Sequence, residues 1–359
     1  MPGLPAGAEV SFLMLVSIIL PSRNEEAFIA KALDSILAQV KGRDDIEVLC
    51  VDGMSTDRTR QIVSDYAARD PRVRLIDNPG RTPPRALNAG IANARGRIIV
   101  RMDCHSECSP NYVEANVELI QRTGAECVGG YVTTLPGKDT PVGRSIAAAL
   151  SGRFGVGNCR SRTVKDSNEE EESDEATFGT WPRELFDRIG LFDERLDRNQ
   201  DMEFFTRIRK HGGRIIVSPK ITVTYYARST FASFCKQAFD NGKWGPYTLY
   251  LVGGGMRPRH FAPMAFVAAL LAGALGGWVW WPLWVLPPAA LLTYLTVGCI
   301  FSVKGAREYR TWWPLVLAAF MQLHLAYGTG SLWGALSAPF RFGLSPRRGR
   351  REPGASQKA

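Results

Sequence analysis

Short apolar runs alternate with helical patterns along the first third of this chain, and this order limits the fold more than any other feature. The apolar runs cover residues 15–20, 46–51, 73–76 and 98–102, and the helical spacing covers residues 26–38, 57–68, 84–94 and 110–122. A helix between successive strands makes those strands parallel, so the pattern predicts an α/β fold with a doubly wound, mostly parallel sheet. Ligands bind at the carboxyl ends of such strands, where Pro21, Asp52 and Asp103 fall.

Three long apolar segments follow residue 260, which predicts a membrane region behind the α/β domain. They cover 261–281, 284–303 and 312–336, each near or above the roughly 20 apolar residues that cross a bilayer, with tryptophans at their ends. The basic segment 304–310 places the α/β domain in the cytoplasm of a multi-pass inner or plasma membrane protein. The third segment contains the glycine-rich stretch 328–334, so it either crosses fully or is broken and re-entrant.

We therefore expect five parts in the chain. They are a leader at 1–14, the α/β domain at 15–228, an interfacial segment at 229–259, a membrane region of two or three spans at 260–340, and a basic cytoplasmic-type tail at 341–359. The leader lacks the positive charge of a signal peptide. Segment 229–259 mixes aromatic residues with lysines, which suits either a helix in the headgroup region or a packed helix at a domain edge.

The net charge of +9 does not indicate a nucleic-acid partner. The tail at 341–359 carries six basic residues against Glu352 alone, and a basic run beside a membrane segment favours contact with anionic lipids. Segment 165–175 packs seven acids into eleven residues and is interpreted as a solvated loop. The seven cysteines show no paired framework, which is typical of a reducing compartment.

Asp103 and His105 follow an apolar run with one residue between them. Side chains two apart on a strand point to the same side, so this pair could hold a divalent cation against a diphosphate. The alternative is a strand that simply ends in polar residues. A zinc site formed with Cys104 and Cys108 is disfavoured because no second ligand pair follows in the sequence.

Asp52 is a second candidate ligand residue at a strand end. It precedes a glycine, and an acid in that position can accept a hydrogen bond from a ribose hydroxyl or a base. Asp57 begins the next helical segment, so a capping role explains it better. Asp52 has no such local explanation and is predicted to contact the ligand.

Four segments make the chain similar to the family 2 glycosyltransferases with a GT-A fold. They are SIILPSRNEE, VDGMSTDRT, ALNAGIANARGRIIVRMDCH and LFDERLDRNQDMEFFTRIRKHGG, in that order and within residues 15–245. The Asp-Cys-His run, the Asn-Gln-Asp of 199–201 and the C-terminal apolar segments most resemble the succinoglycan-type exopolysaccharide glucosyltransferases. The resemblance implies a GT-A-type sheet and a nucleotide pocket lined by Pro21, Arg23, Glu25 and Asp52.

The same resemblance implies a metal site and a catalytic base. Asp103 and His105 match the family's metal-binding Asp-x-Asp, with His105 in the second place. Because Mg²⁺ prefers oxygen ligands and Mn²⁺ accepts imidazole, the cofactor is expected to be Mn²⁺ or Mg²⁺, with Asp103 the firmer ligand. Asp201 matches the catalytic base, with Gln200 in place of the family's first acid. From the residues alone, Asp201 could equally cap the helix that it begins.

Gln237 and Trp244, in the aromatic-rich segment 229–259, only partly match the acceptor motif of the processive synthases. Gln237 and Trp244 have the wrong spacing for the Gln-x-x-Arg-Trp pattern, so single sugar addition is expected rather than polymerisation. For Trp244 itself, membrane anchoring and substrate stacking are both open.

The resulting expectation is a membrane-bound, inverting glycosyltransferase of cell-surface or extracellular polysaccharide synthesis. Its partners would be a UDP-sugar donor, with glucose implied by the resemblance, a lipid-linked oligosaccharide acceptor and the membrane. One alternative is a sugar nucleotidyltransferase, which the SRNEE stretch disfavours because it lacks a glycine-rich basic loop. The other alternative is a non-catalytic membrane scaffold with a transferase-like domain.

Overall fold

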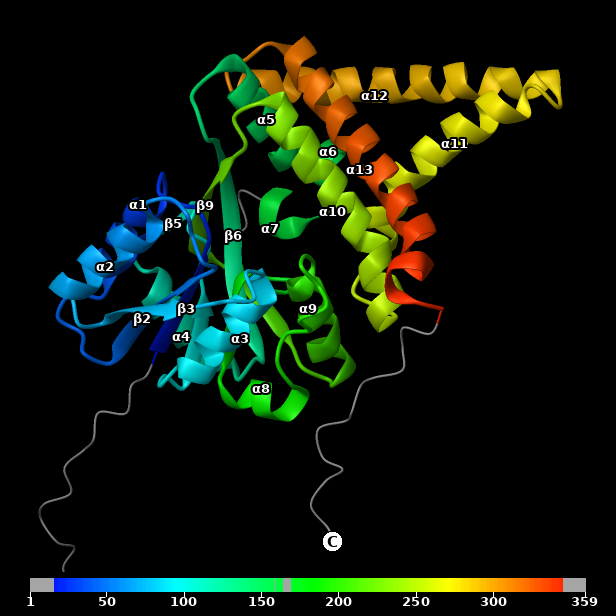
Figure 1. Ribbon diagram of the computed structural model, residues 1–359. Coiled ribbons are helices and arrows are strands. Elements are labelled where there is room, and N and C mark those ends of the chain that lie inside the picture. Colours follow the sequence, from blue (N-terminus) through cyan, green and yellow to red (C-terminus); the bar gives the residue numbers. More distant parts are fainter. Residues whose placement is uncertain (1–15, 158, 164–168, 345–359) are drawn as a thin grey trace, which may run out of the picture. The chain divides into compact units, whose positions relative to one another are not determined.

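The structure is a computed structural model that describes residues 16–157, 159–163 and 169–344 (Figure 1). The described chain divides into two compact units. Unit 1 comprises the residues up to Val128 together with Phe178–Leu191, and unit 2 comprises Gly129–Thr177 together with the residues from Phe192 onward. The expected leader at 1–14 and most of the basic tail lie outside the described residues.

The division at Val128 differs from the expected domain boundary at residue 228. The reason is a shared core in unit 2, where Val132, Tyr225 and Ala227 pack with Phe234 and Phe320 of later helices. Residues that the sequence assigns to the α/β domain therefore belong to the same compact unit as the C-terminal helices.

Unit 1 contains a mixed sheet in the strand order β3-β2-β1-β4-β8. The strands are β1 (Val16–Ser22), β2 (Ile46–Asp52), β3 (Val73–Asp77), β4 (Ile98–Arg101) and β8 (Thr177–Pro182). β1 pairs in parallel with β2 and β4, and β2 pairs in parallel with β3, which confirms the parallel sheet predicted from the sequence. β8 runs antiparallel to β4 and makes the sheet mixed. Every residue of β2 is buried, which explains why the strand is mostly apolar, and its buried Glu47 accepts a hydrogen bond from Ser17 on β1 (2.7 Å).

The helices of unit 1 lie close to the expected ranges. They are α1 (Ile29–Gln39), α2 (Thr59–Arg69), α3 (Pro83–Asn93), α4 (Tyr112–Thr123) and α8 (Glu184–Ile189), with a short strand β5 (Ser106–Cys108) before α4. α3 begins with its proline pair, since proline lacks an N–H and its φ suits the first turn. α1 begins later than expected because the backbone before it bonds to a neighbouring loop, described below.

In unit 2, the long strand β9 lies beside two shorter strands, β6 and β7. β6 (Cys127–Pro136), which begins in unit 1, is the neighbour of β9 (Ile215–Ala227), and β7 (Glu171–Glu172) pairs antiparallel with β9. The sequence predicts two strands at 214–217 and 222–226, whereas β9 is continuous through Pro219. The helices are α5 (Pro141–Ser151), α6 (Arg153–Val156), α7 (Arg160–Thr163) and α9 (Gln200–Lys210).

The C-terminal part of unit 2 is helical. Its elements are α10 (Phe231–Val252), η1 (Pro258–Phe261), α11 (Ala262–Gly276), η2 (Trp281–Val285), α12 (Leu286–Glu308) and α13 (Trp313–Phe342). Three helical segments are long and apolar enough to cross a membrane: Pro258–Gly276, Trp281–Glu308 and Trp313–Phe342. Half of the most apolar stretch in the third is buried inside the protein, against 11% and 6% in the first two.

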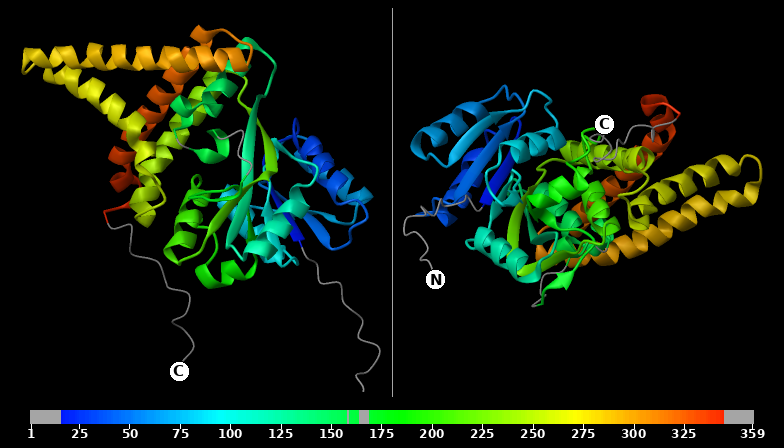
Figure 2. Two further views of the ribbon diagram at one scale, coloured as in Figure 1. Left: turned by 180° about the vertical axis from the view of Figure 1, so that it is seen from behind. Right: turned by 90° about the horizontal axis from the view of Figure 1, so that it is seen from below.

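α13 is an unbroken helix that lies against α10, so the third apolar segment is not broken at its glycine-rich stretch (Figures 1 and 2). Its glycines allow the close contact. A Cβ at Gly330 would overlap the carbonyl oxygen of Phe239, and one at Gly334 would overlap that of Lys243. Small residues one turn apart let helix backbones approach each other in this way. The glycine-rich stretch is therefore a helix–helix contact.

Trp244 on α10 has a packing role, which is neither of the two roles considered from the sequence. Its side chain is 5% exposed and contacts Tyr247 edge-to-face, with the Arg341 guanidinium 5.8 Å from its ring centroid. The same cluster contains Leu196 and Ala338. α10 is thus a packed helix, as in the second interpretation of segment 229–259.

Candidate active site

The loops that follow β1 and β2 in unit 1 are joined by reciprocal hydrogen bonds. Backbone amides of Asn24 and Glu26 donate to Ser55 Oγ (2.9 Å) and Asp57 Oδ2 (3.1 Å). In the other direction, the Arg58 amide donates to Glu26 Oε2 (3.1 Å). These bonds hold the carboxyl ends of neighbouring parallel strands in one fixed arrangement, at the sheet edge where this fold class binds ligands.

The same edge carries strained backbone after three successive strands. Asn24 follows β1, Met54 follows β2 and Arg81 follows β3, and their φ angles are 55°, 58° and 60°. Non-glycine residues rarely adopt positive φ, and such strain gathers at functional sites where the surrounding structure enforces it. The pattern supports a ligand site at this edge.

Asp52, predicted as a ligand residue, is fully buried and engaged in local bonds. One carboxylate oxygen accepts from the Ser55 hydroxyl (2.5 Å), and the other accepts from the Ser55 amide (2.9 Å) and from Arg60 (2.8 Å). Arg60 also pairs with Asp77 at the end of β3 (2.8 Å). Contact between Asp52 and a nucleotide stays a prediction.

Asp57 takes the capping role that the sequence favours. Its carboxylate accepts from the Thr59 and Glu26 amides (3.0 and 3.1 Å). Partial burial raises the pKa of Asp57, but hydrogen bonds from Thr59 and Glu26 outweigh it and lower the pKa below its ordinary value. Asp57 therefore stabilises the joined loops in its charged form.

Asp103 and His105 lie in the turn between β4 and β5, because β4 ends at Arg101. The alternation expected of a strand nevertheless continues through the turn. Asp103 and His105 are half-buried, whereas Met102, which precedes Asp103, and Cys104, which lies between the two, are buried. The two candidate ligands are thus both accessible to solvent. The Arg101 guanidinium donates to the two carboxylate oxygens of Asp103, at 3.1 and 3.3 Å.

The remaining nucleotide candidates adjoin this turn. The Glu25 carboxylate lies 3.7 Å from His105 Nδ1, and the Pro21 carbonyl oxygen accepts a hydrogen bond from the Cys104 thiol (3.3 Å). Arg23 is exposed and its guanidinium lies 3.5 Å from the Arg81 carbonyl oxygen. The structure therefore brings Pro21 and Glu25 to the turn that carries Asp103 and His105.

The donor set fits a divalent cation that shares its ligands with a substrate. Among residues 16–157, 159–163 and 169–344, no three His, Cys, Asp or Glu side chains are grouped to hold a metal alone. A cation of the Mg²⁺ or Mn²⁺ kind needs only one or two protein ligands when phosphates and water supply the rest. Asp103 and His105 meet that requirement, and the buried Cys104 does not join them in a zinc set.

Asp201, the candidate base, belongs to unit 2 at the start of α9. Asn199 precedes it with φ 60°, and the Asp201 Oδ1 accepts from the Met202 amide (2.8 Å). Within α9, Glu203 and Arg207 form a buried ion pair one turn apart (2.5 Å). Asp201 is half-buried at the first turn of this helix.

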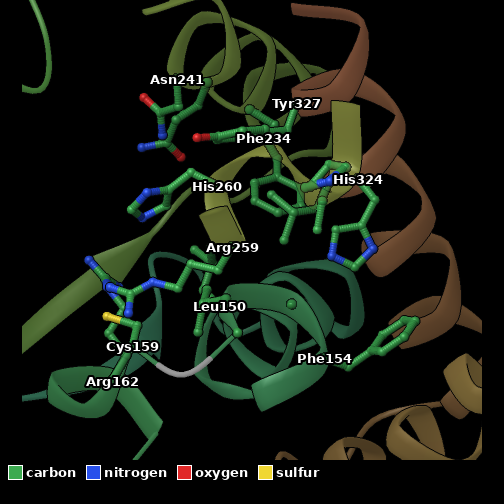
Figure 3. Close-up of a pocket in the computed structure, with 18 of the residues that line it drawn as sticks. Leu150, Phe154, Cys159, Arg162, Phe234, Asn241, Arg259, His260, His324 and Tyr327 are labelled. Carbon is green, nitrogen blue, oxygen red and sulfur yellow. The ribbon is translucent and has the colours of Figure 1, made fainter. Parts of the chain in front are cut away.

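A cavity of about 570 Å³ in unit 2 contains residues that the sequence did not single out (Figure 3). Arg162, Glu175 and Arg259 line it, and Arg259 pairs with Glu175 (3.0 Å). The described end of segment 165–175 is only partly the loop expected, since Glu171–Glu172 forms β7 and Asp174 pairs with Arg257, while Glu169 and Glu170 are exposed. Only the Arg-Pro-Arg-His run at 257–260, directly before an apolar segment, could have indicated this site.

The mixed sheet, with three parallel pairings and the antiparallel β8, together with its covering helices has the architecture of a GT-A glycosyltransferase. Residues 17–188 match the model of glycosyl transferase family 2. The chain is 31% identical to succinoglycan biosynthesis protein ExoA of Rhizobium meliloti, over 87% of this chain and 92% of that protein. The chain belongs to glycosyl transferase family 2.

Two further relatives extend the comparison. A dolichyl N-acetyl-α-D-glucosaminyl phosphate glucuronosyltransferase of Methanococcus voltae is 27% identical, over 63% of this chain and 71% of that protein. The solved mannosyltransferase of Pyrobaculum calidifontis, in complex with GDP-Man and Mn²⁺, superposes with a TM-score of 0.55 at 22% identity and covers 89% of this chain and 87% of that one. The latter confirms the GT-A fold. Membership in the family makes this chain a glycosyltransferase, against the nucleotidyltransferase and scaffold alternatives.

Proposed function

We propose that the protein is a membrane-bound inverting glycosyltransferase that adds one sugar, from a UDP-sugar, to a lipid-linked oligosaccharide in polysaccharide synthesis. The succinoglycan relative supports the polysaccharide role, and the dolichyl phosphate relative supports a lipid-linked acceptor. Glucose as the sugar is implied by the sequence resemblance alone. Three apolar helices support a multi-pass place in the plasma or inner membrane. The basic residues between α12 and α13 support a cytoplasmic active site.

One observation carries the proposal most directly. The nucleotide-side residues Pro21, Glu25 and Asp103 belong to unit 1, whereas the candidate base Asp201 belongs to the unit that contains all three apolar helices. A lipid-linked acceptor presents its sugar at the bilayer surface, so the residue that activates the acceptor belongs with the helices. Under this proposal, unit 1 supplies the residues that bind the donor, and unit 2 supplies the residue that activates the acceptor.

Unit 1 would bind and orient the donor. The joined loops after β1 and β2 form a preorganised edge, and Arg23 and Glu25 would contact the nucleotide there. Asp103 and His105 would hold the Mn²⁺ or Mg²⁺ ion. When bound, such an ion stabilises the negative charge of the leaving diphosphate.

Asp201 would take the proton of the acceptor hydroxyl. As that oxygen forms its bond to the anomeric carbon, the bond from this carbon to the diphosphate oxygen breaks and UDP leaves with the electron pair. A single carboxylate suffices for this displacement, and it inverts the anomeric configuration. Gln200 beside it is buried and uncharged, so one carboxylate is present where the family usually has two acids.

The test is sugar transfer by membranes that contain the full chain. The membranes are offered UDP-glucose, UDP-galactose, UDP-N-acetylglucosamine and GDP-mannose in parallel with extracted lipid-linked oligosaccharides, and the lipid products are analysed by mass. The expected product is heavier by one hexose from UDP-glucose. Transfer from GDP-mannose alone would contradict the donor assignment, and transfer only to water-soluble acceptors would contradict the acceptor assignment.

A further inference from the structure

The 570 Å³ cavity of unit 2 has one charged end and one apolar end. Arg162, Cys159 and Arg259 gather on one side, while Phe154 and His324 lie on another (Figure 3). The apolar part is completed by residues of all three candidate membrane helices: Phe266, Tyr294 and Leu323. A cavity of this size holds a small ligand or one end of a larger molecule.

Two guanidinium groups at the charged end have unused donors. Nη1 of Arg162 and Nε of Arg259 are buried and, within the described part of the chain, have no hydrogen-bond partner. Because buried polar atoms are almost always satisfied, unused donors that line a cavity indicate a ligand with acceptor oxygens.

The charge at this end favours an anion. Two guanidinium groups face one carboxylate, Glu175, which pairs with Arg259 and accepts the Cys159 thiol (3.1 Å). Burial and the neighbouring Glu175 raise the pKa of Cys159 to about 11, so the thiol adds no negative charge at neutral pH. One positive charge remains for a ligand to neutralise.

A second cavity of about 230 Å³ shares Glu175 and Arg259 with the first and extends the cationic end. It is lined by Arg209 and Lys210 and also by Met202, all of α9. Met202 directly follows Asp201, so the helix that begins with the candidate base also borders the cationic region. This arrangement connects the cavity to the acceptor side of the reaction.

We propose that the 570 Å³ cavity binds the phosphate end of the acceptor's lipid carrier. Arg162 and Arg259 contact phosphate oxygens, and Phe154, Phe266 and Tyr294 pack against the first part of the apolar chain. The rest of the chain continues along the membrane helices. The recognised chemistry is a phosphate ester on a long apolar chain, and the proposal rests on the proposed function because that function supplies such an acceptor.

Direct binding tests the proposal. The full chain in detergent is titrated with undecaprenyl phosphate, and the bound fraction is measured by native mass spectrometry. Arg162→Gln and Arg259→Gln are each expected to weaken binding at least tenfold, equivalent to about 1.4 kcal/mol. Arg153→Gln, an exposed arginine on α6, is the matched control and is expected to bind like the unmodified protein.

A third variant guards against loss of folding, since Arg259 also holds Glu175. Phe266→Trp keeps every charge and narrows the apolar end, so it should weaken undecaprenyl phosphate binding while UDP binding is unchanged. Unchanged lipid binding in Arg162→Gln and Phe266→Trp, both with normal UDP binding, would overturn the proposal.

Competing ligands separate the sources of the phosphate. Inorganic phosphate and phosphatidylglycerol are each added against bound undecaprenyl phosphate, and neither is expected to displace it at equal concentration. Displacement by phosphatidylglycerol would show a structural lipid site, and displacement by inorganic phosphate would show a simple anion site, and either result overturns the proposal. If the variants lose lipid binding but no sugar is transferred to any lipid, the proposed function fails and the cavity assignment stands.

Discussion

The Glu25 carboxylate lies 3.7 Å from Nδ1 of His105, at the turn that also carries Asp103. His105 is the imidazole of the proposed metal pair, and Glu25 is the carboxylate beside it. An imidazole ligand shifts preference toward softer ions such as Mn²⁺, whereas Mg²⁺ prefers oxygen.

Exchanging the imidazole for a carboxylate should therefore change the metal preference. In His105→Asp, transfer supported by Mg²⁺ is expected to rise relative to transfer supported by Mn²⁺. Initial rates with each ion, at several concentrations, give the ratio. His211→Asp, at the end of α9 in unit 2, makes the same chemical change away from the turn and should leave the ratio unaltered. An unaltered ratio in His105→Asp as well would remove His105 from the ligand set.

Asp201→Asn should abolish transfer while the donor still binds. Loss of a general base costs on the order of 10²–10⁴-fold in rate, because the acceptor hydroxyl then attacks without losing its proton to the enzyme. UDP binding, measured by calorimetry, should be unchanged because the nucleotide-side residues belong to unit 1. Asp187→Asn on α8 removes an exposed acid and serves as the control. Turnover near the unmodified rate in Asp201→Asn would show that another group is the base.

The parallel sheet could be predicted because both faces of β1 and β2 are covered, so their sequences are mostly apolar, with Ser17 and Glu47 as buried exceptions that bond to each other. β8 could not, since it contains threonines and a glycine and contributes to the sheet only through its antiparallel pairing with β4. β9 appeared as two strands because Pro219 interrupts the apolar pattern, yet the strand continues on either side of it.

The candidate site was predictable where one residue's chemistry decides its role, and less so where a distant partner decides it. The spacing of Asp103 and His105 indicated them as candidates, while their role as metal ligands is implied by the family resemblance and stays a prediction. The burial of Asp52 depends on Arg60, which reaches from α2 to both Asp52 and Asp77. The cavity depends on Arg162 and Arg259, which are far apart in the sequence and meet only through the packing of unit 2. Pattern analysis of single segments cannot find such pairs.

The joined loops should lose part of their stability in acid. The pKa of Asp57 is lowered in the folded protein, so its contribution is present above its ordinary value near 4 and is lost as the pH falls through the lowered value. At pH 7, Asp57→Asn should therefore lower the melting temperature by about one to two degrees, and the difference should shrink near pH 3.5. Asp65→Asn on α2 is the exposed control. A difference that grows in acid would contradict the sign assigned to Asp57.

The contact between α10 and α13 leaves no room for a side chain at Gly330. A Cβ there would overlap the Phe239 carbonyl and approach the Lys243 amide, both of which are helix backbone and cannot move aside independently. Gly330→Leu should separate the two helices and lower the melting temperature in detergent by several degrees, since overpacking costs about 1–3 kcal/mol or more. Ala335→Leu adds a side chain at an exposed position of the same helix and should leave the melting temperature nearly unchanged. Because α13 also contributes Leu323 and His324 to the cavity, Gly330→Leu should weaken undecaprenyl phosphate binding while UDP binding persists. Equal melting temperatures for the two leucine variants would show that α13 does not depend on close approach to α10.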